Sequence, residues 1–336
     1  MSGQGDRVLL GHGSGGLMTA RLVRDVFLRQ LDNPALARLE DSALLDVDGA
    51  RLALTTDAFV VDPLFFPGGD IGKLAVCGTV NDLLVAGARP RALTAAFVLE
   101  EGLPFADLER IAASMARTAA EAGTSVVAGD TKVVPRGKAD GCFITTAGLG
   151  SRLPGVELGA DRARPGDLVL VTGPVGDHGA AIMASRAGIE LSSPIVSDCA
   201  PLTPLLVPLF ERPAGLHVAR DPTRGGVATV LCEIASASGV TVRLEEERLP
   251  VSPAVRAACE LLGLDPFYLA CEGRAVIFAA PEAAERALAT LRGAGATQAA
   301  IVGRVEAGKA QVIARTAIGG HRLVTMLAAD PLPRIC

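Results

Sequence analysis

The sequence predicts an α/β fold, of the α+β kind with mixed sheets, arranged as two domains. Its 336 residues, 49% of them hydrophobic, are enough for two buried cores. Strand-like and helix-like patterns alternate through both halves. Residues 150–166, rich in glycine, proline and charge, separate the halves as a linker would. We therefore expect an N-terminal domain over residues 1–155, a C-terminal domain over 156–327 and a flexible tail over 328–336.

The elements of the first half follow from hydrophobic periodicity and turn residues. Asp48-Gly49 lies between two apolar stretches, residues 43–45 and 52–54, which indicates a tight β-hairpin. Helical periodicity predicts helices over residues 71–85 and 105–122, each followed by a glycine. The other strands expected here are 93–99, 125–128, which we expect to be buried, and 143–147.

The second half repeats the alternation of strands and helices. The predicted strands are 168–171, 240–244, 275–279, 311–314 and 323–326. The predicted helices are 179–187, 226–237, 254–262 and 283–291. Because each half contains both strands and helices, we expect two α/β layers rather than an all-helical or all-strand protein.

Composition excludes several classes of function. The net charge of −5, the absence of Trp and the single Tyr argue against a nucleic-acid surface. No apolar run is long enough to span a bilayer, and the first residues lack a signal segment. The seven cysteines are scattered without a C-x-x-C pair. An odd number without a framework fits a reducing cytoplasm.

The last residue of the chain is a cysteine, Cys336. A thiol on a mobile terminus contributes no core packing, so we expect it to carry a chemical group between two places. Arg334 would favour the thiolate, and Pro331 and Pro333 would stiffen the arm. The alternative is an incidental cysteine on a frayed tail.

A glycine-rich segment near the N-terminus precedes a helical stretch, residues 17–27. Its residues Gly13, Ser14, Gly15 and Gly16 allow a phosphate to approach the backbone N–H groups of the helix start. The segment is neither a Walker loop nor a dinucleotide fingerprint. A glycine-capped helix without a ligand is the alternative.

Four aspartates are expected at the boundaries of elements: Asp41, Asp57, Asp82 and Asp130. Carboxylate oxygens that converge from several elements suit Mg²⁺, which also binds substrate phosphates. Each aspartate alone is more often a cap or turn residue.

A second anion-binding candidate starts the helix near residue 226. Asp221, Thr223 and Arg224 supply a carboxylate, a hydroxyl and a guanidinium beside Gly225-Gly226. A well-capped helix is the alternative for the same residues. The segment Gly176 to Gly179 contains His178, which we interpret as a histidine in a loop or a helix cap.

These motifs together resemble the aminoimidazole ribonucleotide (AIR) synthetase superfamily, which includes selenophosphate synthetase and thiamin-monophosphate kinase. The residues that carry the resemblance are Glu40-Asp41, Thr55-Thr56-Asp57, Val80-Asn81-Asp82-Leu83, Gly129-Asp130 and Asp221 to Gly226. The resemblance implies ATP and Mg²⁺ as cofactors. It assigns nucleotide contacts to Gly13, Ser14, Gly15, Gly16, Asp57, Asn81, Asp82, Gly129, Asp130, Asp221, Thr223 and Arg224, and metal contacts to Asp41, Asp57, Asp82 and Asp130.

Within the superfamily the chain is similar to the hydrogenase maturation carbamoyl dehydratases. Gly11 to Gly16, Gly176 to Gly179, Asp221 to Gly226 and the ending Pro333-Arg334-Ile335-Cys336 carry that similarity. It implies that a carbamoyl group on Cys336 is activated by ATP at its amide oxygen and loses phosphate to leave an S-cyanate. The cyano group then becomes a ligand of the iron in a nickel–iron hydrogenase.

The same resemblance implies further roles and partners. Glu272 and Lys132 are the two candidates for the base that removes the nitrogen protons, and Arg334 accompanies Cys336. Without the family, Glu272 would read as a surface salt bridge and Lys132 as a solvated lysine. The expected partners are a HypF-type carbamoyltransferase, an iron scaffold complex of HypC/HypD type and a second copy of the chain, whose strands complete a barrel across a homodimer. ATP is expected in a cleft beside that sheet, and the tail is expected to fold back on the C-terminal domain.

Two other functions remain as alternatives. Selenophosphate synthetase typically carries a reactive cysteine near its N-terminus, whereas the first cysteine here is Cys77, inside a predicted helix. A nucleotide-binding scaffold or metal chaperone would use Cys336 as a ligand, although a lone thiol makes a poor metal site.

Overall fold

The computed structural model describes residues 7–31, 33–188, 195–329 and 332–336, and Pro331 lies outside them. The described chain builds two sheets, one of five strands and one of seven, and a two-stranded ribbon. None of the described helices combines the length and the apolar character that a membrane span needs.

The five-stranded sheet comes from the first half of the chain. Its strand order is β1-β2-β7-β5-β6, with bounds β1 Ala43–Val47, β2 Ala50–Phe59, β5 Ala88–Glu100, β6 Val126–Val134 and β7 Cys142–Arg152. The predicted hairpin is confirmed: Asp48 and Gly49 both have positive φ, 49° and 83°, which suits a tight turn between antiparallel β1 and β2. All neighbouring strands are antiparallel except β5 and β6, which are parallel.

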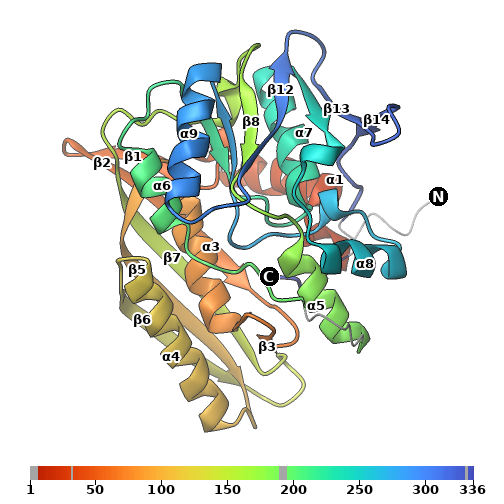
Figure 1. The fold of residues 1–336 in the computed structure, drawn as a ribbon. Coiled ribbons are helices and arrows are strands. Elements are labelled where there is room, and N and C mark those ends of the chain that lie inside the picture. Colours follow the sequence, from red (N-terminus) through yellow and green to blue (C-terminus); the bar gives the residue numbers. More distant parts are fainter. Residues whose placement is uncertain (1–6, 32, 189–194, 330–331) are drawn as a thin grey trace.

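Helix α3, Ile71–Val85, is buried along nearly its whole length. It packs on β2, β7 and β5 on one side, and on α4 (Phe105–Glu121) and α6 (Thr203–Leu209) on others. A helix that is apolar all round requires cover all round, which explains its place in the middle of the molecule (Figure 1). Its last turns carry polar side chains to the seam between the two sheets.

The seven-stranded sheet has the order β14-β13-β10-β12-β8-β11-β9. Its strands are β8 Leu168–Val171, β9 Leu216–Arg220, β10 Thr241–Glu245, β11 Val276–Ala279, β12 Ala300–Glu306, β13 Gln311–Arg315 and β14 His321–Val324. Its helices are α5 Asp177–Ala187, α7 Gly226–Ser238, α8 Pro253–Leu262 and α9 Pro281–Gly293. Alternate residues of β8 face opposite layers: Val169 and Val171 pack with α7, whereas Leu170 packs in the cluster that holds α9.

Shorter elements complete the described chain. They are η1 Leu10–His12, α1 Gly16–Leu22, a π-helical turn Val23–Leu28, α2 Arg29–Leu31, η3 Leu36–Arg38, β3 Phe65–Phe66, β4 Gly69–Asp70, η4 Ala160–Arg162, η5 Glu246–Arg248 and η6 Pro266–Tyr268. One hydrophobic cluster runs from Phe59 and Leu74 through Ile182 and Leu206 to Leu291, so the two halves share a core. The division at residues 155 and 156 stays a prediction.

Several predicted elements differ from the structure. The strand expected to be buried at 125–128 is β6, an edge strand whose side chains are almost all exposed. Asp57 and Asp130 lie inside β2 and β6 rather than after strands. Three elements, β9, β12 and α6, are not predicted from the sequence. In α6, Pro204 and Pro208 interrupt the apolar run, so it does not show a helical pattern.

The end of the chain is packed rather than free. Leu332 and Ile335 are buried at 3% and 2% exposure, and Cys336 packs against the shared core, contrary to the expectation for a terminal thiol. The C-terminus therefore lies in the middle of the molecule, close to α5 (Figure 1).

Candidate functional site

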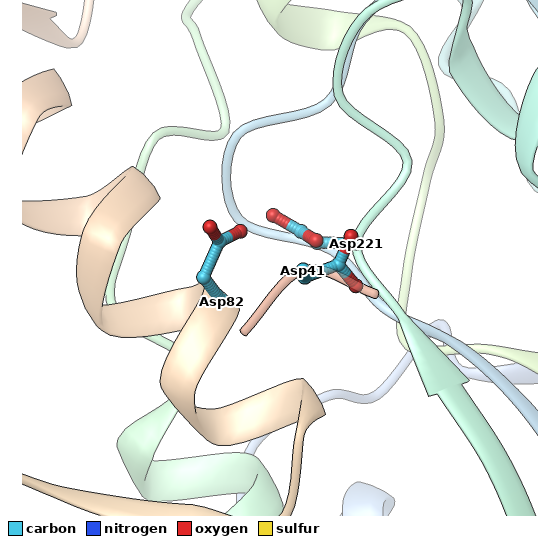
Figure 2. Close-up of side chains that lie close together, drawn as sticks. All are labelled: Asp41, Asp82 and Asp221. Carbon is cyan, nitrogen blue, oxygen red and sulfur yellow. The ribbon is translucent and has the colours of Figure 1, made fainter. Parts of the chain in front are cut away.

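Three carboxylates converge where the two sheets meet. Asp82 comes from the last turn of α3, Asp221 follows β9 directly, and Asp41 precedes β1. An oxygen from each lies within 4.8 Å of the others, and Figure 2 shows the three side chains pointing toward one another. Three elements that are distant in sequence thus supply one potential cation site.

The charge of this cluster is poorly compensated by solvent. Burial raises the pKa of Asp82 well above its usual range, and Asp57, Asp221 and Asp41 raise it further. Burial likewise raises the pKa of Asp221, to about 6, against the opposing effect of Arg220. Hard oxygen ligands that repel one another when ionised are the donor set that Mg²⁺ takes, so the cluster fits that ion.

Arg220, at the end of β9, partly neutralises the cluster. Its Nε atom lies 2.8 Å from Asp41 Oδ2, and its two Nη atoms contact Glu40 at 3.2 Å and Glu233 at 3.4 Å. This arginine is not predicted as a site residue from the sequence. The feature that could have identified it is a charged residue at the end of an apolar strand, directly before Asp221.

The predicted metal set is only partly brought together. Asp57 adjoins the cluster from β2, through hydrogen bonding with Asp82 and a 3.5 Å contact from Thr79 Oγ1. Asp130 does not join it within the single chain: on the exposed strand β6 it pairs with Lys132 at 2.7 Å. Gly129 is in the same strand. Asp221, which we expected at the nucleotide, occupies the third position of the cluster instead.

The glycine-rich segment lines a cavity of about 500 Å³ beside the cluster. Gly15, Gly16 and Thr19 form one wall, and Asp41, Asp221, Thr223 and Arg224 form part of another. Arg224 also ties the segment down, because its Nη1 donates to the carbonyl of Gly13 at 3.1 Å. Ser14 is buried and donates to the carbonyl of Gly11 at 3.2 Å.

The helix start at this segment differs from an open phosphate cradle. The N–H groups of Leu17 and Met18 donate to the carbonyls of Leu327 and Ala328, each at 2.9 Å. The N–H of Gly15 donates to Thr19 Oγ1, also at 2.9 Å. Positive charge in the cavity comes instead from arginine side chains on three segments, Arg24, Arg220 and Arg224.

Arg224 connects the docked end of the chain to the carboxylates. The charge of Cys336 is the largest influence that raises the pKa of Arg224, and Asp57, Glu272 and Asp82 add to it. The carbonyl of Cys336 accepts from the N–H of Val60 at 3.1 Å, which holds the last residue against the end of β2. The guanidinium beside the terminal cysteine is thus Arg224. Arg334 instead binds Asp140 at 2.8 Å and the carbonyl of Val60 at 3.2 Å.

Glu272 is buried at 2% exposure near the same arginine. Its Oε1 atom has no hydrogen-bond partner among the described residues. Burial raises the pKa of Glu272 well above its usual range, and Cys199 raises it further. An unpartnered carboxylate with a raised pKa is a strong base for its type, so the geometry supports proton abstraction. The surface salt bridge considered for Glu272 is wrong.

Three other residues that the sequence singles out lie in different surroundings. The side chain of Asn81 binds main-chain groups. It donates to the carbonyls of Ala200 and Glu272 and accepts from the N–H of Leu202. Lys132 is largely exposed beside Asp130. His178, expected in a loop or cap, lies in the first turn of α5 and is fully buried.

Comparison with known proteins places these features in a family. The family model described as "AIR synthase related protein, N-terminal domain" matches residues 39–151, and the C-terminal counterpart matches 164–315. A carbamoyl dehydratase HypE of Rhodobacter capsulatus is 52% identical over 339 residues, which covers 98% of either chain. A solved HypE–HypF complex is similar with a TM-score of 0.87 and 47% identity, covering 91% of this chain and 99% of that one. HypE in complex with ATP is similar with a TM-score of 0.80 and 48% identity, covering 98% of this chain and all of the other.

The carboxylate cluster leads to a prediction for Asp82→Asn. In the unfolded chain these aspartates ionise near their ordinary pKa of 3.8, whereas in the fold Asp82 and Asp221 ionise at higher pH. The metal-free fold therefore loses stability as pH rises from about 4 through about 6 and beyond. Asp82→Asn should melt at a higher temperature than the wild type near about pH 7.5 without Mg²⁺, and this gain should shrink near about pH 4.5.

The same variant should bind Mg–ATP about tenfold more weakly, or worse, by calorimetry. Asp46→Asn is the matched control, because Asp46 is exposed on β1. Unchanged affinity for Mg–ATP, or a variant that is less stable at every pH, would remove Asp82 from the cation site.

Proposed function

The chain belongs to the AIR synthase related family and, within it, to the carbamoyl dehydratases HypE, and we propose that it dehydrates a carbamoyl group on its own Cys336. The reaction consumes ATP and supplies the cyanide ligands of iron in hydrogenase maturation. The observation that carries this proposal is the docked C-terminus: Cys336 is held beside Arg224, which also adjoins Glu272 and the carboxylates.

The reaction proceeds in two steps at the S-carboxamide of Cys336. The amide oxygen attacks the γ-phosphorus of ATP, so the bond to ADP breaks and an O-phosphorylated intermediate forms. The C–O bond then breaks with loss of phosphate, and the nitrogen gives up both protons. The products are the S-cyanate, ADP and phosphate, which together account for the removal of one water. Phosphorylation is needed because an amide oxygen is a poor leaving group.

The residues of the site have distinct roles in this chemistry. Asp41, Asp57, Asp82 and Asp221 would hold Mg²⁺, which when bound offsets the charge of the phosphates. Arg224 and Thr223 line the cavity where the phosphates are proposed to lie. Glu272 takes a nitrogen proton, which its raised pKa favours.

Partners act on the same cysteine at other stages. We propose that a HypF-type carbamoyltransferase loads Cys336 and that an iron scaffold complex of HypC/HypD type receives the cyano group. A relative solved as a HypE–HypF complex supports the first of these partners. The buried position of the tail requires that it leave the site for loading. No disulfide is found among the other six cysteines, Cys77, Cys142, Cys199, Cys232, Cys259 and Cys271, which supports a place in the reducing cytoplasm.

The exposed strand β6 supports a homodimer. β6 is nine residues long and lies at the edge of its sheet, where unpaired main-chain groups are open to another strand. A groove of about 620 Å³ runs beside it and is lined by small apolar residues of α4 and by Val126 and Val127. We propose that a second copy pairs along β6. That pairing would bring Gly129, Asp130 and Lys132 to the interface between the two chains.

The alternatives have less support. A metal chaperone would need ligands around Cys336, yet the potential metal-binding group found among the described residues consists of Asp41, Asp82 and Asp221. Cys77, the first cysteine, is fully buried in α3 rather than placed as a reactive N-terminal residue of the selenophosphate synthetase kind.

The mass of the C-terminal peptide tests the reaction directly. After loading by the carbamoyltransferase, the peptide should gain one carbamoyl group on Cys336. On addition of Mg–ATP it should lose the mass of one water. Cys336→Ala should still bind ATP but show neither change, and it should fail to support hydrogenase maturation. A carbamoyl adduct that persists with ATP, or maturation supported by Cys336→Ala, would refute the proposal.

The choice of base is tested by Glu272→Gln and Lys132→Gln. Gln keeps the size of Glu272 and removes its basicity, so the loaded peptide should lose water about 100-fold more slowly or worse. Lys132→Gln is the matched comparison, because Lys132 is exposed on β6 and paired with Asp130. A normal rate in Glu272→Gln together with a slow rate in Lys132→Gln would assign the base to Lys132.

The dimer is tested by placing a charge in the β6 groove. The wild type should have a solution mass of twice 34.3 kDa by light scattering. Val127, 63% exposed on β6, becomes buried if a second copy covers it, so Val127→Glu should weaken association by about tenfold or more. Leu261→Glu on α8, where the leucine is 69% exposed, should leave the dimer unchanged. A monomeric wild type would contradict the pairing.

A further inference from the structure

Helix α5 holds the main chain of the last residues through two of its side chains. Arg186 donates from Nη1 to the carbonyl of Pro333 at 2.8 Å and from Nη2 to the carbonyl of Arg334. His178 Nε2 lies 2.8 Å from the carbonyl oxygen of Ile335. Three consecutive carbonyls are therefore bound by residues about two turns apart on one helix.

His178 is fixed in a single orientation. A carbonyl oxygen only accepts, so Nε2 must carry the proton that it donates to Ile335. In the neutral ring Nδ1 then accepts from the hydroxyl of Ser197, which is 2.8 Å away. The ring also packs edge-on against Phe66, with 5.4 Å between ring centres. Burial lowers the pKa of His178, which favours the neutral ring that this arrangement needs.

The same segment of chain supports both His178 and the proposed base. Asp198 Oδ1 accepts from the N–H of His178 at 3.1 Å and from the N–H of Glu272 at 3.3 Å. Its Oδ2 accepts from the N–H of Gly273 at 3.2 Å. A Cβ on Gly273 would lie 1.9 Å from the carbonyl oxygen of Asp198, so this close approach requires glycine. One buried carboxylate thus binds the main chain of both the histidine at the tail and the proposed base.

We propose that His178 and Arg186 are the positioning residues of the tail, which seat Cys336 near Arg224 for dehydration. This inference rests on the proposed function for its chemical consequence, although docking itself is measurable without ATP. Both side chains bind main-chain carbonyls of the tail, so both act through the main chain. Both hold the tail by hydrogen bonds to carbonyls, and such bonds allow it to leave the site for loading and return.

Docking is tested first, without ATP or partner proteins. The rate at which iodoacetamide modifies Cys336 is read from the mass of the C-terminal peptide. His178→Leu, which lacks the donor, should be modified about tenfold faster than the wild type, because a lost hydrogen bond of ordinary strength frees the tail by that factor. His178→Gln retains a donor and should stay near the wild type.

Arg186→Met tests the second contact at a partly exposed site, in case His178→Leu fails to fold. It should also speed modification about tenfold. Ser185→Ala is the matched control, because Ser185 is exposed on the same helix.

Separate measurements of loading and of dehydration then distinguish a loss of tail positioning from a general loss of structure. In His178→Leu and Arg186→Met, loading by the carbamoyltransferase should be unchanged or faster, whereas ATP-dependent loss of water should slow about tenfold. ATP binding should be unchanged. The proposal is overturned if both variants protect Cys336 like the wild type, or if they expose it and still dehydrate at the normal rate. A wild type that never loses water with ATP would instead reject the proposed function, and the alkylation rates would still decide the docking contacts.

Discussion

The structure depends on holding several carboxylates close together at the seam between its two sheets. Asp41, Asp82 and Asp221 come from three separate elements, and their mutual repulsion opposes the approach of those elements. Arg220 offsets part of that repulsion from within the fold. Burial of the hydrophobic cluster that both sheets share offsets the rest of this repulsion. A cation and a nucleotide would therefore find a site whose ligands are already assembled at a cost to the free protein.

Two polar residues, Asn81 and Asp198, hold the main chain around Glu272 at this seam. Asn81, next to Asp82 in α3, binds the carbonyl of Glu272, and Asp198 binds the N–H groups of Glu272 and Gly273. The proposed base is thus supported on both sides of its peptide. Since these partners are buried and hydrogen-bonded, the main chain of Glu272 has little freedom to move.

Much of the fold was predictable because it is encoded locally. The Asp48-Gly49 hairpin and the 71–85 helix appear with their expected bounds, since turn chemistry and periodicity act over a few residues. The burial of β6 was predicted wrongly, because an apolar run does not reveal whether a strand is central or at an edge. The cluster of Asp41 and Asp82 was expected through the family, but Asp221 in place of Asp130 depends on tertiary contacts. His178 lies in the motif Gly176 to Gly179, whereas Arg186 and Asp198 lie in none. The contacts of all three became visible only in the structure, because they join segments that are distant in sequence.

The contacts of the tail have a consequence for how its sequence is free to vary. Val60, His178 and Arg186 all bind carbonyl oxygens of residues 333–336, and every amino acid has a carbonyl. Such contacts fix the spacing of the last residues without recognising their side chains, whereas the buried side chain of Ile335 and the ion pair of Arg334 still constrain those two positions. Substitution would be tolerated more readily at position 333 than at 334 or 335, whereas one residue inserted between Pro333 and Cys336 would displace the thiol by roughly one residue length, about 3.5 Å.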